Sequence, residues 1–169
     1  KIVTNPMFLI SSPIAIFIFI FLFNKYYSTQ NGRFIIDRII LNIPLFGDLI
    51  LRSEIASMSD TLSTLCNAGI NLVDGLERCI TASGNEIIRR ALRKSITMVR
   101  EGQELSYSLT LSKVIPGLVV SMIKIGEESG ALPFMLDNIA NFYKREVEET
   151  VGSLTKAMEP LIISVVAGI

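Results

Sequence analysis

The residues with the clearest potential for chemistry are two adjacent carboxylates, Glu127 and Glu128, within GEESGALPFML at residues 126–136. A carboxylate pair can serve acid–base catalysis, and a loop of carboxylates can bind a metal ion. Side chains adjacent in sequence point about 100° apart on a helix, so these two do not face one another as a catalytic pair requires. A divalent cation would need several more oxygen ligands, of which Asp137 offers one. The sequence therefore predicts neither a catalytic pair nor a metal site here.

The glycines of this segment favour a third interpretation, a joint between two helices. Gly126 and Gly130 permit backbone conformations that other residues avoid. Ser129-Gly130 is placed to end one helix before Leu132 begins the next. We therefore predict that Gly126 and Gly130 are structural and that Glu128 is solvated.

The composition excludes several classes of enzyme. The chain contains no histidine, which removes Ser-His triads, His-ligated metals and the most common general base. It also lacks a nucleotide-binding loop of the form GxxxxGK followed by Ser or Thr. Cys66 and Cys79 each fall on an apolar helical face, which predicts buried free thiols. We expect no catalytic activity and no cofactor, and the formal net charge of zero predicts no nucleic-acid partner.

Two apolar runs predict membrane helices. Half of the residues are hydrophobic and the mean hydropathy is +0.50, which is unusually apolar for a soluble domain. Met7–Phe23 holds 17 residues without a charge, nearly enough to cross about 30 Å of hydrocarbon. The Asn-Lys-Tyr-Tyr boundary at residues 24–27 indicates a retained span rather than a cleaved signal peptide. We predict a transmembrane helix over residues 1–23 and, from PLIISVVAGI, the start of another over residues 156–169, within a longer membrane protein.

The charges that flank the first span predict its orientation. Lys25, Arg33 and Arg38 follow the span closely, whereas only Lys1 precedes it. The positive-inside rule then places the residues between the two spans in the cytoplasm. We divide these residues into a membrane-proximal connector, 24–52, with an amphipathic piece at Arg33–Leu41 near the membrane surface, and a cytoplasmic bundle domain, 53–155.

The residues between the spans show helical periodicity, and no long run alternates like a strand. The fold class we predict is all-α, an antiparallel bundle of about six helices flanked by transmembrane helices. Gly69 is expected to end the first bundle helix, and Asn71 and Asn85 to cap the next two. The predicted inner faces are, in chain order, Ile55, Met58, Leu62 and Leu65; Leu72, Leu76, Cys79 and Ile80; Ile88, Leu92, Ile96 and Val99; and Leu118, Val119, Met122 and Ile123.

The last predicted helix is the longest and leads into the second apolar run. Glu104–Leu109, earlier in the chain, is predicted to be only one short helical turn. From Leu136 to Leu161 the apolar residues keep helical spacing without interruption, so bundle and membrane helix should form one continuous rod. Pro160 lacks an amide donor, which makes it a structural landmark where the rod can kink. The stripe comprises Leu136, Ile139, Tyr143, Val147, Val151, Leu154, Met158 and Leu161.

A series of short motifs in a fixed order resembles a known family. After the apolar span come PLFG, LSTLCNAGINLVDGL, a Gly-Asn break, GQELSYSL, GEESGAL, NFYKREVE and MEPLII, between residues 44 and 163. This order is similar to that of the inner-membrane platform proteins of type IV pilus machines and type II secretion systems (protein F). The resemblance covers nearly the whole chain, and its strength lies in the order of the motifs rather than in any one of them.

The resemblance implies an architecture and a role. Family members have two copies of a six-helix cytoplasmic domain and three spans, of which this sequence resembles the second span, the second domain and the start of the third span. It implies a non-enzymatic assembly platform, multi-pass in the bacterial inner membrane, that couples a cytoplasmic hexameric ATPase to the insertion or removal of pilin or pseudopilin subunits. Further implied partners are other inner-membrane machine components, membrane lipid and further copies of the chain in a homo-oligomer.

Three sets of residues are candidate contacts. Glu127 matches a glutamate of the family, for which we expect a partner contact or a buried hydrogen bond. Glu159, before Pro160, matches a Glu-Pro at the membrane entrance, and it either reaches water or contacts a pilin or a neighbouring subunit. The basic side chains of residues 89–100 form either a solvated or lipid-facing surface or a docking site for an acidic patch of the ATPase, with Arg89, Arg93 and Arg100 as the candidates.

Two other classes of protein fit the sequence less well. A transporter or channel subunit needs polar residues along a path through the membrane, and Met7–Phe23 offers only Ser11 and Ser12. A membrane-anchored enzyme is disfavoured by the absence of histidine and of a nucleotide loop. The sequence does not distinguish a secretion machine from one for pili or DNA uptake.

Overall fold

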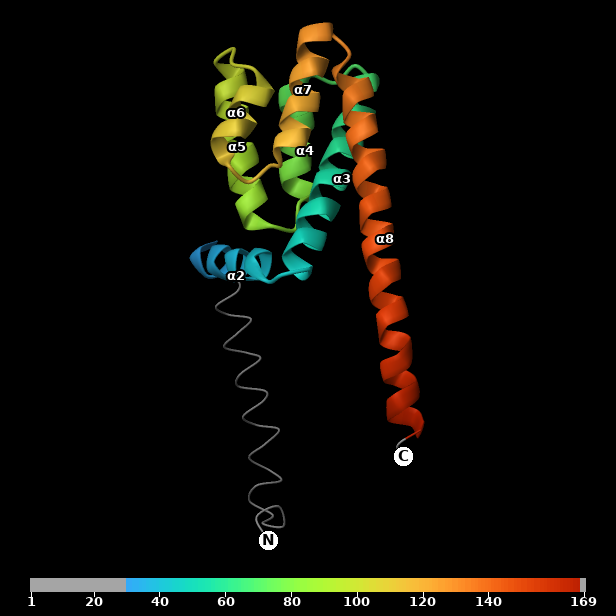
Figure 1. The fold of residues 1–169 in the computed structure, drawn as a ribbon. Coiled ribbons are helices and arrows are strands. Elements are labelled where there is room, and N and C mark those ends of the chain that lie inside the picture. The colour runs from blue at the N-terminus through green and yellow to red at the C-terminus, as the bar shows by residue number, and fades with distance from the viewer. Residues whose placement is uncertain (1–29, 168–169) are drawn as a thin grey trace. The chain divides into compact units, whose positions relative to one another are not determined.

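The computed structural model describes residues 30–167, so the predicted span Met7–Phe23 lies outside the described residues. The described chain is helical and contains no strand, which confirms the all-α fold class. None of its helices combines the length and the apolarity that crossing a bilayer requires. In chain order the helices are α2 (Gln30–Asn42), α3 (Phe46–Asn67), α4 (Leu72–Ala82), α5 (Glu86–Arg100), α6 (Leu105–Ser112), α7 (Gly117–Ser129) and α8 (Leu132–Ala167) (Figure 1).

The chain divides into two compact units, residues 1–40 and residues 41–169. In the first unit the described residues form most of α2. This helix is amphipathic: Ile35 and Ile39 are exposed, whereas Asp37 is buried.

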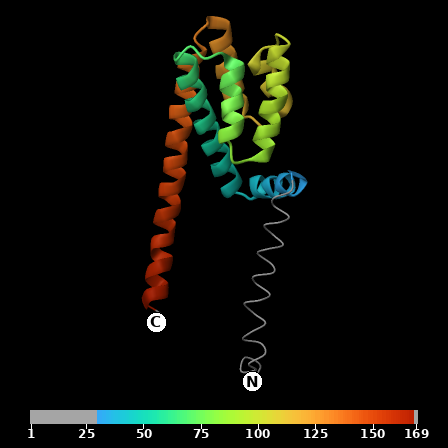
Figure 2. The same cartoon turned by 180° about the vertical axis from the view of Figure 1, so that it is seen from behind.

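The second unit is a bundle whose helices form a closed cycle of contacts. Each helix from α3 to α8 packs against the next one along the chain, and α8 returns to pack against α3 (Figure 2). Helices α3 and α8 run antiparallel. Ion pairs join them along their length, with Lys144 Nζ 2.7 Å from Asp60 Oδ1 and Arg52 in contact with Glu146. The long last helix is thereby held against the first helix of the bundle.

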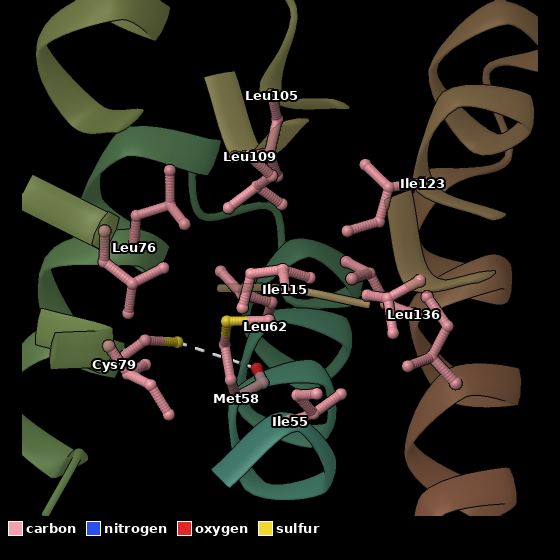
Figure 3. Close-up of a cluster of buried hydrophobic side chains, with 14 of the residues drawn as sticks. Ile55, Met58, Leu62, Leu76, Cys79, Leu105, Leu109, Ile115, Ile123 and Leu136 are labelled. Carbon is pink, nitrogen blue, oxygen red and sulfur yellow. Dashed lines mark hydrogen bonds between the residues drawn. The ribbon is translucent and has the colours of Figure 1, made fainter. Parts of the chain in front are cut away.

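Apolar side chains from all six helices meet between them (Figure 3). Leu62 of α3 is fully buried, as are side chains of α4, α5, α6, α7 and α8. Burial of this kind stabilises the fold by about 1.5–3 kcal/mol for each large aliphatic side chain. The predicted residues that are buried are Ile55, Met58, Leu62, Leu76, Cys79, Ile88, Leu92, Ile96, Val119, Ile123, Leu136, Ile139 and Tyr143.

Some predicted core positions were wrong. Leu118 is 51% exposed because it lies on the outer face of α7, next to the buried Val119. Leu65 is only half-buried. Val151 and Met158 are 46% and 55% exposed, but they were predicted as part of the continuous rod and not as core residues. Their part of α8 lies near or beyond the start of α3, so no helix of the bundle covers it.

The predicted helix boundaries at Asn71, Asn85 and Gly69 are confirmed. The Asn71 side chain accepts the Asp74 N–H at 2.9 Å, and that of Asn85 accepts the Ile87 N–H at 2.9 Å. Gly69 takes a φ of 79° just after α3, a left-handed conformation that side-chain-bearing residues seldom adopt. Helix α6 departs from its prediction, since it has 8 residues rather than one turn.

Candidate functional site

Glu127 connects the end of α7 to the start of α6. Its Oε1 accepts the Leu105 N–H at 2.6 Å, and its Oε2 accepts the Ser106 N–H at 3.0 Å. These are two of the amide donors that a helix leaves unpaired at its first turn, and a carboxylate there also interacts favourably with the helix dipole. Glu104, which occupies the N-cap position, makes no capping hydrogen bond with its own side chain. Glu127 therefore caps α6 from a different helix.

Glu128 has different surroundings from its neighbour. Its side chain is 59% exposed, and Oε1 lies 3.7 Å from Lys124 Nζ of the preceding turn. An exposed pair of this kind contributes little stability. The two carboxylates therefore point into different environments and do not form a facing pair. Within the described residues, no group of three or more histidine, cysteine, aspartate or glutamate side chains is placed to hold a metal ion.

The glycines of GEESGAL form the joint between α7 and α8. Gly130 follows α7 with a φ of 68°, and the Ala131 N–H returns to the Gly126 carbonyl at 2.9 Å. Gly126 lies inside α7 and does not have a positive φ, so the prediction that it serves the joint through an unusual backbone conformation is wrong. This glycine instead allows two helices to pack closely. A Cβ at Gly126 would lie 3.0 Å from the Leu132 Cα and 3.1 Å from the Met135 Cβ. Because Gly126 has no side chain, the first turn of α8 can pack closely against α7.

The basic face of α5 is organised around a buried acid. Glu86, only 5% exposed, accepts a hydrogen bond from Arg93 at 2.9 Å and one from Arg90 at 3.3 Å. Arg89 lies 3.9 Å from the same carboxylate and donates through Nε to the Ser83 carbonyl at 2.8 Å. Burial favours the neutral form of Glu86, but the hydrogen bonds from Arg93 and Arg90 outweigh it and lower its pKa. Two of the three candidate arginines, Arg89 and Arg93, therefore lie around the same buried acid.

Arg100 is separated from this cluster. It lies at the last turn of α5 and pairs with Glu77 of α4, with both side chains more than half exposed. The structure thus brings Arg89 and Arg93 together at one carboxylate and leaves Arg100 about two turns further along the helix.

Two glutamates with internal roles were missed by the sequence analysis. Glu86 precedes Arg89, Arg90 and Arg93 by three, four and seven residues, a helical spacing that could have identified the cluster. Glu54 of α3 accepts the Ser83 hydroxyl at 2.7 Å and the Gly84 N–H at 2.8 Å, and so holds the turn between α4 and α5. No local signal indicates this contact, because the partners are about 30 residues apart.

Helix α8 continues past the bundle through the predicted membrane entrance. Its α-helical backbone runs from Leu132 to Ala167 and includes both Glu159 and Pro160. The side chain of Glu159 lies outside the described part of the chain, so its two predicted roles stay predictions.

The two cysteines differ in burial. Cys79 is 2% exposed and its thiol donates to the Met58 carbonyl at 3.6 Å, whereas Cys66 is only half-buried. Both are free, as predicted, but full burial holds for Cys79 alone. Desolvation raises the pKa of both thiols, and that of Cys79 rises to about 12.

We expect Cys66 to be alkylated well before Cys79 at mildly alkaline pH, because the thiolate is the nucleophile and Cys79 is both buried and protonated. Timed alkylation followed by mass spectrometry measures both rates. Between pH 9.0, the ordinary thiol pKa, and about 12, the unfolded chain loses the Cys79 proton while the folded chain keeps it, so stability should fall across that window. Equal alkylation rates for the two thiols in the folded chain would contradict this assignment.

The fold and the joint between α7 and α8 define a class of protein: a six-helix bundle whose last helix continues beyond the bundle as a long rod. Residues 58–169 match the family described as Type II secretion system (T2SS), protein F, and the chain belongs to this family. The family resemblance seen in the sequence is thereby confirmed.

Similar proteins carry names from two kinds of machine. The chain is 39% identical over 161 residues to the type IV pilus assembly protein PilC of Thermus thermophilus, covering 95% of this chain and 38% of that protein. It is 40% identical over 137 residues to PilC of Pseudomonas aeruginosa, covering 81% of this chain and 37% of that protein. It is 32% identical over 124 residues to type II secretion system protein F of the same organism, covering 73% and 31% respectively. The chain thus spans a little over a third of the length of its pilus relatives.

Proposed function

We propose that this chain is part of a non-enzymatic assembly platform in the bacterial inner membrane, in a type IV pilus or type II secretion machine. Membership of the T2SS protein F family supports this role, as do relatives named for both machines. In this proposal the bundle lies in the cytoplasm, and α8 enters the bilayer near Pro160. The platform couples a cytoplasmic hexameric ATPase to the insertion or removal of pilin or pseudopilin subunits, and it acts as a homo-oligomer.

The observation that carries the mechanical part of the proposal is the continuity of α8. A single helix of 36 residues leads from the α7 joint to Ala167, and its first part is clamped to α3 by ion pairs and apolar packing. A continuous helix transmits a tilt or rotation of the bundle, whereas a flexible linker would dissipate it. Movement imposed on the bundle by the ATPase would therefore reach the membrane end of α8.

The basic face of α5 is our candidate contact for the ATPase. Arg90, Arg93 and Lys94 remain exposed there, and the buried Glu86 offsets only part of their charge. An acidic patch of a partner would complement this surface. Reversing the charge at Arg89 or Arg93 would place a carboxylate beside Glu86, so such a variant tests folding as well as docking.

Inserting a short Gly-Ser linker after Gly152, in the full platform protein, is expected to abolish fibre assembly while ATPase binding is retained. The linker interrupts α8 outside the core, since Gly152 has no neighbouring atoms within 4 Å of a Cβ position. Fibres on the cell surface and copurification of the ATPase are the two measurements.

The matched control is Gly152→Ala, which changes the same position but strengthens the helix by about 1 kcal/mol. This variant should assemble fibres normally. If the linker variant also assembles fibres at the normal rate, coupling through α8 is wrong and the bundle is a passive scaffold.

A further inference from the structure

The turn before α3 exposes three large apolar side chains within four residues. We call residues Ile43–Phe46 the IPLF loop; Ile43, Leu45 and Phe46 are 43%, 50% and 56% exposed. Isolated exposed apolar residues are common on protein surfaces, but a contiguous group marks a contact site. Nothing in the bundle covers these side chains.

The backbone of the IPLF loop is tightly folded. Leu45 has φ 74° and ψ −53°, and it is one of two non-glycine residues with a positive φ in the described chain. Such a conformation costs about 1–3 kcal/mol for a residue with a branched side chain. The turn is closed by the Gly47 N–H, which donates to the Ile43 carbonyl at 2.8 Å. A Cβ at Gly47 would lie only 2.1 Å from the Leu41 carbonyl oxygen. The loop is therefore a close turn that fixes the direction of its apolar side chains.

The loop lies at the end of the bundle from which α8 projects. Ser63 contacts Pro133 and Arg52 contacts Glu146, so in the antiparallel pair Phe46 lies level with about residues 150–152 of α8. Beyond that level α8 continues for about 15 residues, or roughly 22 Å, and ends in the uncharged sequence PLIISVVA (Figure 1). The exposed apolar loop and the apolar end of the rod thus belong to the same end of this unit.

The distances along α8 match the depth of a membrane interface. From the level of Phe46 to Pro160 there are eight to ten residues, about 12–15 Å of helix. The headgroup layer on one side of a bilayer accounts for roughly 5–8 Å of this, which leaves roughly 4–10 Å to be spanned by the exposed Leu45 and Phe46 side chains. If Pro160 marks the edge of the hydrocarbon, these side chains reach the headgroup layer.

We propose that the IPLF loop is a second membrane contact of the bundle, with Leu45 and Phe46 inserted among the lipid headgroups. The inference rests on the proposed function in one respect, the entry of α8 into the bilayer. A lipid surface is favoured over a protein partner because three side chains are far too small an area for a stable protein interface. Lipid insertion needs only apolar area at the correct height. Together with α8, the loop fixes the angle of the bundle against the membrane.

The test uses tryptophan as a depth probe, since the chain contains none. Phe46→Trp is placed in the 169-residue chain and reconstituted into phosphatidylcholine vesicles that carry bromine either near the headgroup or near the end of the acyl chain. Phe134→Trp is the matched control, because Phe134 is 63% exposed but lies at the start of α8, at the other end of the bundle. Ile163→Trp reports on the apolar end of α8. Circular dichroism confirms that each variant is folded.

We expect Phe46→Trp to lose most of its fluorescence to the shallow bromines, Ile163→Trp to lose it to the deep ones, and Phe134→Trp to be unaffected. If Ile163→Trp is quenched but Phe46→Trp is not, the loop proposal is wrong while the entry of α8 into the bilayer stands. If neither is quenched, membrane entry and the loop proposal both fail. Equal quenching of Phe46→Trp and Phe134→Trp would show non-specific adsorption and would also overturn the proposal.

Discussion

Replacing Leu62 with alanine is expected to lower the free energy of unfolding by about 2–5 kcal/mol. Leu62 is 0% exposed at the centre of the cluster in Figure 3, and one of its methyl groups lies 3.0 Å from a Cβ position at Gly75 of α4. Truncation removes its contacts and leaves a cavity that the close packing of α3 and α4 cannot fill. Equilibrium denaturation of the chain in detergent, followed by circular dichroism, measures the change.

The control for this prediction is another leucine with the same chemistry but a different environment. Leu118 is 51% exposed on the outer face of α7, so Leu118→Ala should change stability by less than about 0.5 kcal/mol. Comparable losses of stability for the two variants would show that the buried and exposed faces of α3 or α7 are wrongly assigned.

Replacing Glu127 with alanine is expected to destabilise the bundle by about 2 kcal/mol, because two amide donors of α6 lose their acceptor. The affected N–H groups belong to Leu105 and Ser106, and both residues are buried. Besides this loss of overall stability, the first turn of α6 should open more readily. Amide hydrogen exchange at these two positions should accelerate more than exchange in α4, and denaturation gives the overall change.

Glu128→Ala is the matched control for the Glu127 variant. It removes an adjacent carboxylate whose only described ion pair is exposed, so a change within about 0.5 kcal/mol is expected. Glu127→Gln should fall between the two, since the amide oxygen can accept one of the two hydrogen bonds. If all three variants have the same free energy of unfolding, the capping role of Glu127 is wrong.

Features that depend on neighbouring residues were predicted well from the sequence. Asn71 and Asn85 cap α4 and α5 with their own side chains, and Gly69 ends α3 through its own φ. Each of these signals acts within one helical turn. The apolar stripes of α3 and α5 were likewise read from their spacing, because a helix that packs on one side must bury one face.

Features that depend on distant residues were not predicted. The length of α6 was underestimated because its first turn is capped by Glu127, 22 residues away in sequence. The apolar stripe from Leu136 to Leu161 predicted one continuous helix, but how much of this helix the bundle covers depends on where α3 begins, at Phe46, which cannot be read from the stripe itself. Glu54 was overlooked because its partners, the Ser83 hydroxyl and the Gly84 N–H, are about 30 residues away and meet it only in the folded bundle.

The closed cycle of helices has a consequence for the order in which the protein is made. From α3 to α8, all the main helix interfaces but one join consecutive helices, and the exception joins the first to the last. Contacts between consecutive helices need only sequence that has already been synthesised, so they can form while the ribosome is still extending the chain. The interface of α3 with α8 must wait until the last helix has emerged. During that interval the side of α3 that carries Ser63 and Arg52 lacks its partner helix.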